Sequence, residues 1–368
     1  MSALTSRRAW TGVLVAGLLA SVGTGATVSA AAADIDGDGG GDALCYTTAA
    51  SGDVWYDGPS ASKRYDNRFW RYASPADRSV IDIPAGLIAD RYVPQGLAAV
   101  ANWDGTSEDI LLISAYRETV DGDDAVDGPS RVYGVVASGS RTGTGLGYVT
   151  LGKSPSGTNV SLRGHAGGVA VYQGYVHVGS EQAIYAYPWS RIRSGLAGAS
   201  SSTPVRPSAV EGTSYTVGFL GSGDGYLWAG RFEKSTTAHL NRYVHRSGGN
   251  GRLTYQSQLF APAKTQGVAV TSQGVVFTTS WTRGDRSNVW VFKRGVATRT
   301  DANNSCFRAP SMIEGVTTLN GRAYVVYEGA AYKYHHDGNG TPRNSVSRIH
   351  SAALGDLTGL LTNAAAND

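Results

Sequence analysis

The sequence has little cysteine, little methionine and almost no excess charge. Its 368 residues contain two Cys and two Met, and 32 Lys and Arg stand against 29 Asp and Glu. If Arg7 and Arg8 leave with an export signal, 30 basic side chains remain against 29 acidic ones, a net charge of +1. Such a balanced chain gives no electrostatic reason to expect nucleic acid or an acidic membrane surface as a partner.

Common catalytic fingerprints are missing as well. The chain has no G-x-S-x-G turn, no H-E-x-x-H pair, no P-loop and no Rossmann glycine pattern. Each of these motifs places particular groups for one kind of chemistry. The sequence therefore does not indicate an α/β-hydrolase, a zinc peptidase, a nucleotide hydrolase or a dinucleotide enzyme.

Long apolar runs are absent after the first residues, and residues 1–33 are predicted to be a signal peptide. Arg7 and Arg8 give a positive start, and the apolar run Gly12–Leu19 is too short to span a bilayer. The arginine pair also fits a twin-arginine signal, and both export routes remain open. We expect a secreted, monomeric protein without a membrane span.

Glycine and aromatic residues are abundant instead. The chain has 49 Gly, 20 Tyr and 8 Trp, which suits many short strands joined by tight turns. The stretch Thr265–Trp281 predicts two strands around a turn, and related copies start at Gly96, Gly168, Gly218, Gly267 and Gly315. The later copies are about 50 residues apart, a period typical of β-propellers. We predict an all-β fold with a single propeller of five blades, or six if residues 43–92 form a blade.

The repeats divide the mature chain into four parts. An acidic loop at 34–42 is followed by strands at 43–92 that close or cover the ring, by the propeller at 93–350 and by a tail at 351–368. Each copy contains two apolar strands and a third strand rich in aromatic residues, which in the last copy is predicted at 330–334.

The acidic loop reads D-x-D-x-D-G-x-x-D, with carboxylates at Asp34, Asp36, Asp38 and Asp42. Carboxylates at this density in a tightly turned loop suit Ca²⁺, and the alternative is a flexible acidic tail. Residues 34–57, with the strand-like sequences DALCY and GDVWY, resemble the calcium loop of FG-GAP (integrin-type) propeller repeats. The resemblance implies a structural calcium ion and carries no catalytic residue with it.

The two cysteines are Cys45 and Cys306. An exported protein meets an oxidising compartment, so a disulfide between them is favoured over two buried thiols. Cys45 belongs to the first strand of the mature chain and Cys306 comes shortly before the last repeat, so closing the ring should bring them together.

Equivalent residues of the innermost strands should form a ring around the propeller axis. Directly before the repeat glycine, the ring consists of Gln95, Gly167, Val217, Gln266 and Glu314. Near the end of the following strand, the polar residues are Ser114, Ser180 or Glu181, Arg231 with Glu233, Ser280, and Glu328, and His165 begins the second copy. Polar side chains in apolar strands need partners, so we expect these residues to converge at the channel mouth.

The functional interpretation assigns catalysis to Glu314, Glu328, Glu181, His165 and Arg231, with the two glutamates Glu314 and Glu328 as acid and base or as metal ligands. It assigns substrate binding to Gln95, Gln266, Ser114 and Ser280, and it expects Gly167 and Val217 to leave room for a ligand. The alternative is a structural ring of waters and hydrogen bonds between blades.

Two functions follow from these interpretations. The first is a secreted enzyme that cleaves an extracellular glycan, or another polymer or glycoconjugate, by hydrolysis or elimination. The second is a non-catalytic, lectin-like propeller that binds carbohydrate or a surface through aromatic pockets. The polar residues differ from copy to copy, which favours a single uneven site over a repeated pocket.

Overall fold

The structure, a computed structural model, describes most of the chain from residue 81 onward. It covers residues 54–55, 64–65 and 81–358, apart from 106, 119–127, 199, 236, 286, 294–303, 343–344 and 356. For residues 54–55, 64–65 and 304–308 only the backbone is described. All of these residues belong to the compact unit formed by residues 34–368.

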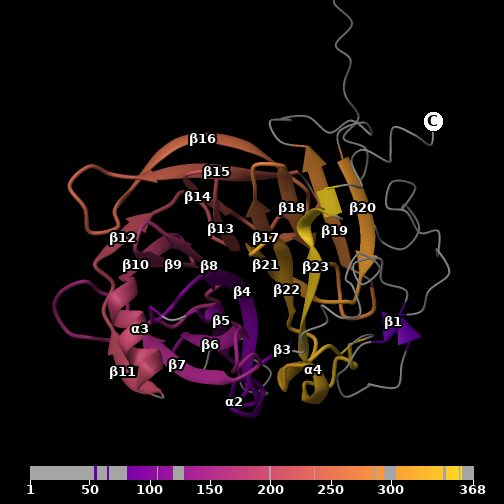
Figure 1. Cartoon of the computed structure of the whole chain (residues 1–368), viewed down its shortest axis with the longest axis horizontal. Coiled ribbons are helices and arrows are strands. Elements are labelled where there is room, and N and C mark those ends of the chain that lie inside the picture. Colours follow the sequence, from indigo (N-terminus) through magenta and orange to yellow (C-terminus); the bar gives the residue numbers. More distant parts are fainter. Residues whose placement is uncertain are drawn as a thin grey trace, which may run out of the picture. The chain divides into compact units, whose positions relative to one another are not determined.

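Five small sheets are arranged in a ring and form a five-bladed β-propeller (Figure 1). From the axis outward, blade 1 contains β4 (Tyr92–Val100), β5 (Asp109–Arg117), β6 (Arg131–Ser138), β7 (Gly145–Leu151) and β11 (Ser201–Val205). Blade 2 contains β8 (Gly168–Tyr172), β9 (Tyr175–Ser180), β10 (Ala183–Pro188) and β12 (Ala209–Gly212). Blade 3 contains β13 (Phe219–Gly223), β14 (Tyr226–Gly230), β15 (Ala238–His245) and β16 (Leu253–Ala261).

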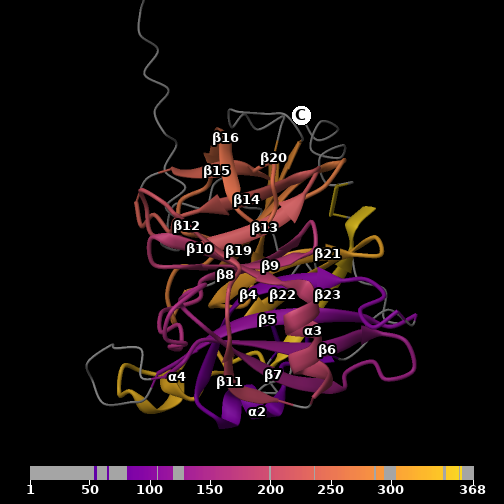
Figure 2. The same cartoon turned by 90° about the vertical axis from the view of Figure 1, so that its left-hand side faces the viewer.

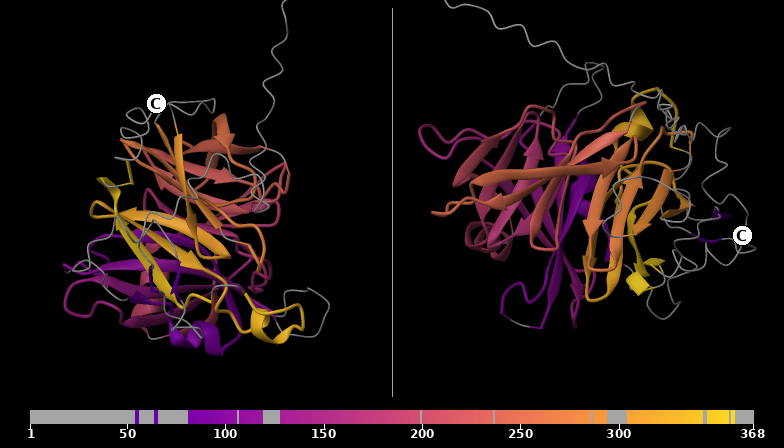
Figure 3. Two further views of the ribbon diagram at one scale, coloured as in Figure 1. Left: turned by 90° about the vertical axis from the view of Figure 1, so that its right-hand side faces the viewer. Right: turned by 90° about the horizontal axis from the view of Figure 1, so that it is seen from above.

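Blades 4 and 5 lie side by side in the right-hand part of Figure 1 and in Figure 3. Blade 4 contains β17 (Thr265–Val270), β18 (Gly274–Thr279), β19 (Ser287–Lys293) and β20 (Asn304–Ala309). Blade 5 contains β21 (Ile313–Leu319), β22 (Arg322–Tyr327), β23 (Arg348–Ala353) and β3 (Ile81–Asp82). Neighbouring strands are antiparallel except β11, which runs parallel to β7. The predicted all-β, five-bladed propeller is confirmed.

Short elements complete the described chain. The strands β1 (Val54–Trp55) and β2 (Arg64–Tyr65) pair only with each other. The helices include α2 (Ala85–Ala89), α3 (Trp189–Ala197) and α4 (Lys333–His336), and Figure 2 shows α3 against the outer part of blade 1. No helix of the described part is long and apolar enough to cross a membrane.

The last blade is completed by a strand from near the start of the described chain. β3 pairs with β23, with Ile81 opposite Ile349 and Asp82 opposite Arg348. Three strands of blade 5 thus come from the end of the chain and one from the beginning, so hydrogen bonds close the ring. The predicted domain boundaries at 92/93 and 350/351 fall inside β4 and β23.

The repeat glycines allow the inner strands to touch backbone to backbone. A Cβ atom on Gly96 would lie 2.4 Å from the Val169 nitrogen, and one on Gly168 would lie 2.1 Å from the Leu220 nitrogen. A Cβ atom on Gly315 would lie 2.3 Å from the nitrogen of Leu97 in blade 1. These distances are far below van der Waals contact, so any side chain here would force the blades apart.

The hydrophobic core is divided among the interfaces between blades. Five of the buried clusters each combine side chains from two neighbouring blades. Leu112 and Val176, for example, belong to the cluster shared by blades 1 and 2, whereas Leu97 and Val326 belong to the one that joins blades 5 and 1. Each blade is therefore stabilised by burying both of its faces.

Candidate active site at the channel mouth

Three of the five inner strands carry a bulge at the position expected to face the channel. The strand register shifts around Gln95 in β4, around Gln266 in β17 and around Glu314 in β21. A bulge inserts an extra residue and redirects its side chain out of the regular alternation. The equivalent residues of blades 2 and 3, Gly167 and Val217, precede β8 and β13 instead of lying within them.

The redirected side chains lie beside a second carboxyl group, that of Glu328. Gln266 Nε2 donates a hydrogen bond to Glu314 Oε1 at 3.0 Å, across the contact between blades 4 and 5. Gln95 Nε2 donates to Glu328 Oε2 at 2.9 Å, across the contact between blades 5 and 1. Glu328 directly follows β22, and its Oε2 also accepts a hydrogen bond from the Tyr334 hydroxyl at 2.7 Å. The structure therefore brings together four residues that the sequence predicted at one site.

The two carboxyl groups are buried, and each influences the titration of the other. Glu314 is fully buried and Glu328 is 9% exposed. Burial raises the pKa of Glu314 well above its usual range, and the nearby Glu328 charge raises it further. Burial also raises the pKa of Glu328 to about 7, against the hydrogen bonds from Tyr334 and Gln95 that favour its charged form. Both pKa values are raised, so the pair keeps at least one proton near neutral pH and titrates as a coupled unit.

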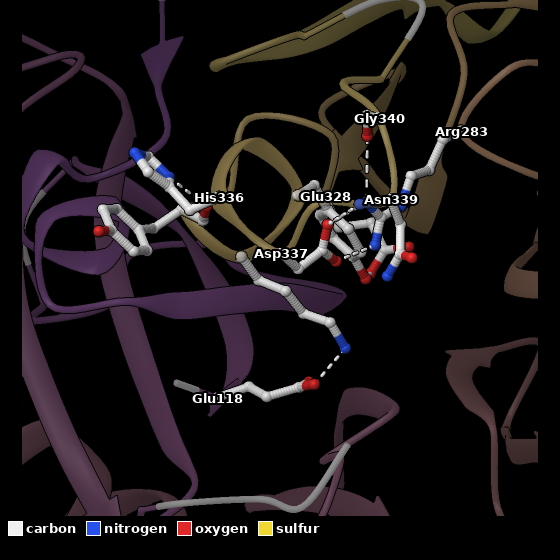
Figure 4. A network of polar contacts seen from close by, with 10 residues as sticks. Glu118, Arg283, Glu328, His336, Asp337, Asn339 and Gly340 are labelled. Carbon is white, nitrogen blue, oxygen red and sulfur yellow. Dashed lines mark hydrogen bonds and ion pairs between the residues drawn. The ribbon is translucent and has the colours of Figure 1, made fainter. Parts of the chain in front are cut away.

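A cover segment, residues 329–340 between β22 and β23, closes the carboxyl pair off from solvent. Its helix α4 contributes Tyr334, which is only 8% exposed, and Lys333, whose ammonium group pairs with the Glu118 carboxylate of blade 1 (Figure 4). Asp337 pairs with Arg283 of blade 4, with Arg283 Nη1 2.6 Å from Asp337 Oδ1. The hydrogen bonds from Arg283 hold the pKa of Asp337 well below its usual range.

Aromatic rings extend the site toward blade 2. Tyr116 at the end of β5 is 3% exposed, and burial together with the charges of Glu328 and Glu118 raises its pKa well above the usual value. The His165 ring lies 4.7 Å from the Tyr116 ring, centroid to centroid. His165 is itself exposed, so it lies at the rim of the site.

The structure places the other predicted residues elsewhere. Ser114 joins blades 1 and 2, because its hydroxyl accepts from the Gly96 N–H at 3.0 Å and donates to the Ala166 carbonyl at 2.8 Å. Ser280 is buried after β18. Glu181 is exposed at a turn with φ +50°. Arg231 pairs with Glu233 and lines a cavity on the flank of the propeller.

Two expectations about the mouth are wrong. Gly167 leaves no room for a ligand, because a Cβ atom there would lie 2.6 Å from the Gly218 carbonyl oxygen, and Val217 is buried in the core between blades 2 and 3. The aromatic strand predicted at 330–334 is the beginning of the cover segment, and the third strand of blade 5 is β23. In this stretch Tyr334 contacts Glu328 and also packs with Val93 and Tyr116 of blade 1.

Sequence reasoning missed the residues that surround the pair. Tyr334, Lys333 and Asp337 come from the cover segment, and their partners Glu118 and Arg283 lie in other blades. One sequence signal could have found them. Residues 332–337 are charged and aromatic and lie within one long connection, and this distinguishes the last copy from the others.

Several predicted features lie outside the described residues. These are the acidic residues Asp34, Asp36, Asp38 and Asp42, the cysteine Cys45 and the side chain of Cys306. In the part of the chain that the structure describes, no group of three or more His, Cys, Asp and Glu is placed to hold a metal ion.

Comparisons with known proteins add no further constraint. No protein-family model matches the chain, and a search of curated proteins finds no significant match. The function is therefore inferred from the chemistry of the site.

Proposed function

We propose that the protein is a secreted hydrolase that acts at the channel mouth on an extracellular glycan or on another polymer or glycoconjugate. The observation that carries this proposal is the buried pair Glu314 and Glu328, whose pKa values are both raised. A pair that holds one proton and one charge near neutral pH supplies a general acid and a general base at one place. Export is supported by the predicted signal peptide.

The way in which two carboxyl groups act in hydrolysis depends on how they are arranged. Glycosidases that use opposed carboxyl groups separate them by about 5–5.5 Å or about 6.5–9.5 Å, which leaves room for the sugar or a water. In aspartic proteases, two neighbouring carboxyl groups instead share one proton. The coupled pair Glu314 and Glu328 resembles this second arrangement, which favours direct attack by an activated water on the substrate.

In this mechanism the Glu328 carboxylate takes a proton from water, and the water oxygen attacks the scissile centre. Glu314 gives its proton to the leaving oxygen or nitrogen. Glu328 is then protonated and Glu314 ionised, and transfer of one proton from Glu328 to Glu314 restores the pair. Gln266 and Gln95 fix the positions of the Glu314 and Glu328 carboxyl groups by hydrogen bonds from their amide N–H groups.

The mouth is closed in this structure, so substrate must displace the cover segment. Tyr334 occupies a hydrogen-bonding position on Glu328 that a substrate hydroxyl or water would take over. Opening the ion pairs of Lys333 and Asp337 would release α4 as a unit. The same movement exposes the carboxyl pair and Tyr116.

The proposal is tested by a turnover screen on extracellular polysaccharides and glycoproteins, run with and without chelator because 34–42 is a predicted calcium loop. Glu314→Gln keeps the shape of a neutral acid but removes the proton that is transferred, so turnover should fall about 10²–10⁴-fold while the fold is retained. Turnover should rise with pH through about 7, as Glu328 ionises, and fall where Glu314 loses its proton.

Glu108→Gln is the matched control, because Glu108 precedes β5 at the opposite end from Glu118 and pairs with Arg141. Its turnover should equal that of the unaltered protein. Equal turnover in Glu314→Gln would contradict the proposal. If no substrate is cleaved and glycan binding is the same in both proteins, the non-catalytic, lectin-like function is the correct one.

A further inference from the structure

A cavity of about 550 Å³ lies on the flank of the propeller, between the outer parts of blades 2 and 3. Its size is within the range of about 300–1,000 Å³ typical of small-molecule sites. We call it the flank cavity. It is lined by the end of β12, by residues 213–215 and by one face of β15 and β16. Its main residues are Glu211, Tyr215, Asn241, Tyr243, Tyr255 and Gln258.

A β-bulge gives the cavity its chemical character. Tyr255 of β16 pairs with Tyr243 of β15, and Gln258 pairs with Asn241. Tyr255 and Gln258 are three positions apart and would point to opposite faces of a regular strand. The register shift at this point inserts an extra residue, so both side chains point into the same cavity.

The aromatic residues form a rigid wall with hydroxyl groups at its base. Tyr255 is 51% exposed. Its ring packs edge to face with the Tyr243 ring, and the two ring centroids are 5.9 Å apart. The hydroxyls of Tyr243 and Tyr215 are 3.0 Å apart. One of them donates to the other, so the accepting hydroxyl keeps its own proton for a ligand.

The charges of the cavity are balanced within the protein. Glu211 lies 3.9 Å from Arg246, and Arg231 pairs with Glu233. Within the described part of the chain, the side chain of Gln258 makes no hydrogen bond, so its amide can both donate and accept. The cavity thus offers an aromatic wall and mixed donors and acceptors, without an excess of either charge.

We propose that the flank cavity binds one or two units of a neutral saccharide chain. The C–H face of a pyranose ring is apolar and packs on Tyr255, while its hydroxyls both donate and accept hydrogen bonds and match Gln258, Asn241 and the tyrosine pair. A charged ligand would lack a counter-charge here. The inference goes beyond the proposed function, because this site binds whether or not the carboxyl pair is catalytic.

The test measures binding of neutral oligosaccharides by calorimetry, using gluco-, xylo-, manno- and chito-oligosaccharides of two to six units. At least one should bind to the unaltered protein, with an affinity that changes little with salt. Tyr255→Ala should weaken that binding at least about tenfold, which corresponds to about 1.4 kcal/mol. Tyr255→Phe keeps the ring and should bind nearly as well.

Gln256→Ala is the matched control, because Gln256 is the exposed neighbour on β16 and does not line the cavity. It should bind like the unaltered protein. Melting curves verify that Tyr255→Ala is folded, which its exposure leads us to expect.

Binding that survives Tyr255→Ala, binding of charged oligosaccharides only, or no neutral binding at millimolar concentration would each overturn the inference. Glu314→Gln should leave binding to the flank cavity unchanged. If it abolishes binding while Tyr255→Ala does not, the saccharide site is at the channel mouth, so failure of this inference is distinguished from failure of the proposed function.

Discussion

At the scale of single residues, Gly168 has no side chain because β8 passes directly against β13. A Cβ atom there would lie 2.1 Å from the Leu220 nitrogen and 2.6 Å from the Phe219 carbonyl carbon. We expect Gly168→Ala to lower the free energy of unfolding by about 3 kcal/mol, the upper end of typical overpacking costs, because backbone has to move.

The control for this prediction is Gly86→Ala in α2. A Cβ atom on Gly86 meets nothing within 4 Å, and alanine is favoured over glycine in a helix by about 0.5–1 kcal/mol. Denaturant unfolding should therefore show one variant destabilised and the other unchanged or slightly stabilised. Equal stabilities would mean that the inner strands separate at little cost.

Buried histidines should make stability depend on pH. His177 in β9 is fully buried, its Nε2 lies 3.1 Å from the Nε2 of His245, and burial lowers its pKa to about 3. A histidine whose pKa is lowered by folding contributes stability above its usual value of 6.5, and this contribution is lost as the pH falls toward 3. The carboxyl pair has the opposite sign, because its raised pKa values give stability that is lost as the pH rises above about 4.5.

The contribution of His177 is therefore measured as the difference in stability between the unaltered protein and a variant without this histidine. His177→Gln keeps a polar partner for His245 but does not titrate, so its stability deficit relative to the unaltered protein should shrink as the pH is lowered from 7 to 4. His239→Gln, at an exposed position of β15, serves as the control. A deficit that stays constant across this range would show that folding does not lower the pKa of His177.

At the scale of elements, the sequence predicted which residues occupy equivalent positions in the blades, but not the direction in which each side chain points. The residue before the repeat glycine is Gln95, Gln266 or Glu314 in three copies, and the structure places all three beside the carboxyl pair because propeller symmetry turns equivalent positions into neighbours. The bulges at these positions carry no sequence signal apart from the polar residue itself. Where the residue is Gly167 or Val217, the same position is filled by neighbouring backbone or core.

The cover segment could not be predicted from local sequence, because its structure depends on partners far along the chain. Asp337 is held by Arg283 and Lys333 by Glu118, over sequence separations of 54 and 215 residues. An isolated helix as short as α4 has no stability of its own. An aromatic strand was therefore the natural interpretation of residues 330–334.

The ion pair to blade 4 should control how often the cover segment opens. Asp337→Asn removes the charge that pairs with Arg283 but keeps a similar shape. We expect amide hydrogen exchange across residues 329–340 to accelerate at least about fivefold, equivalent to about 1 kcal/mol of local stability. Exchange in β22 should stay the same, and so should exchange of the cover segment in Asp82→Asn, which removes a surface carboxylate. Unchanged exchange in Asp337→Asn would show that Tyr334 and the apolar contacts of α4 hold the segment without this pair.

At the scale of the whole molecule, the glycine period predicted a ring because no other arrangement lets five similar units each bury two faces. The position of the closing strand was harder to predict, since β3 has only two residues and carries no repeat signature. Its role depends on pairing with β23, about 270 residues later in the chain. Only the three-dimensional pairing shows that blade 5 is shared between distant parts of the sequence.

Ring closure leads to the last prediction. Ile81 of β3 is 1% exposed and packs in the core that joins blades 5 and 1, so Ile81→Ala should lower the free energy of unfolding by about 2–4 kcal/mol. Its neighbour Asp82 has a side chain that is 65% exposed and pairs with Arg348 at 3.2 Å, so Asp82→Asn should cost less than about 1 kcal/mol. Because opening blade 5 frees both of its neighbours, Ile81→Ala should also broaden the thermal transition. A sharp transition with an unchanged midpoint would mean that the ring stays closed without β3, held by the contact between the inner strands β21 and β4.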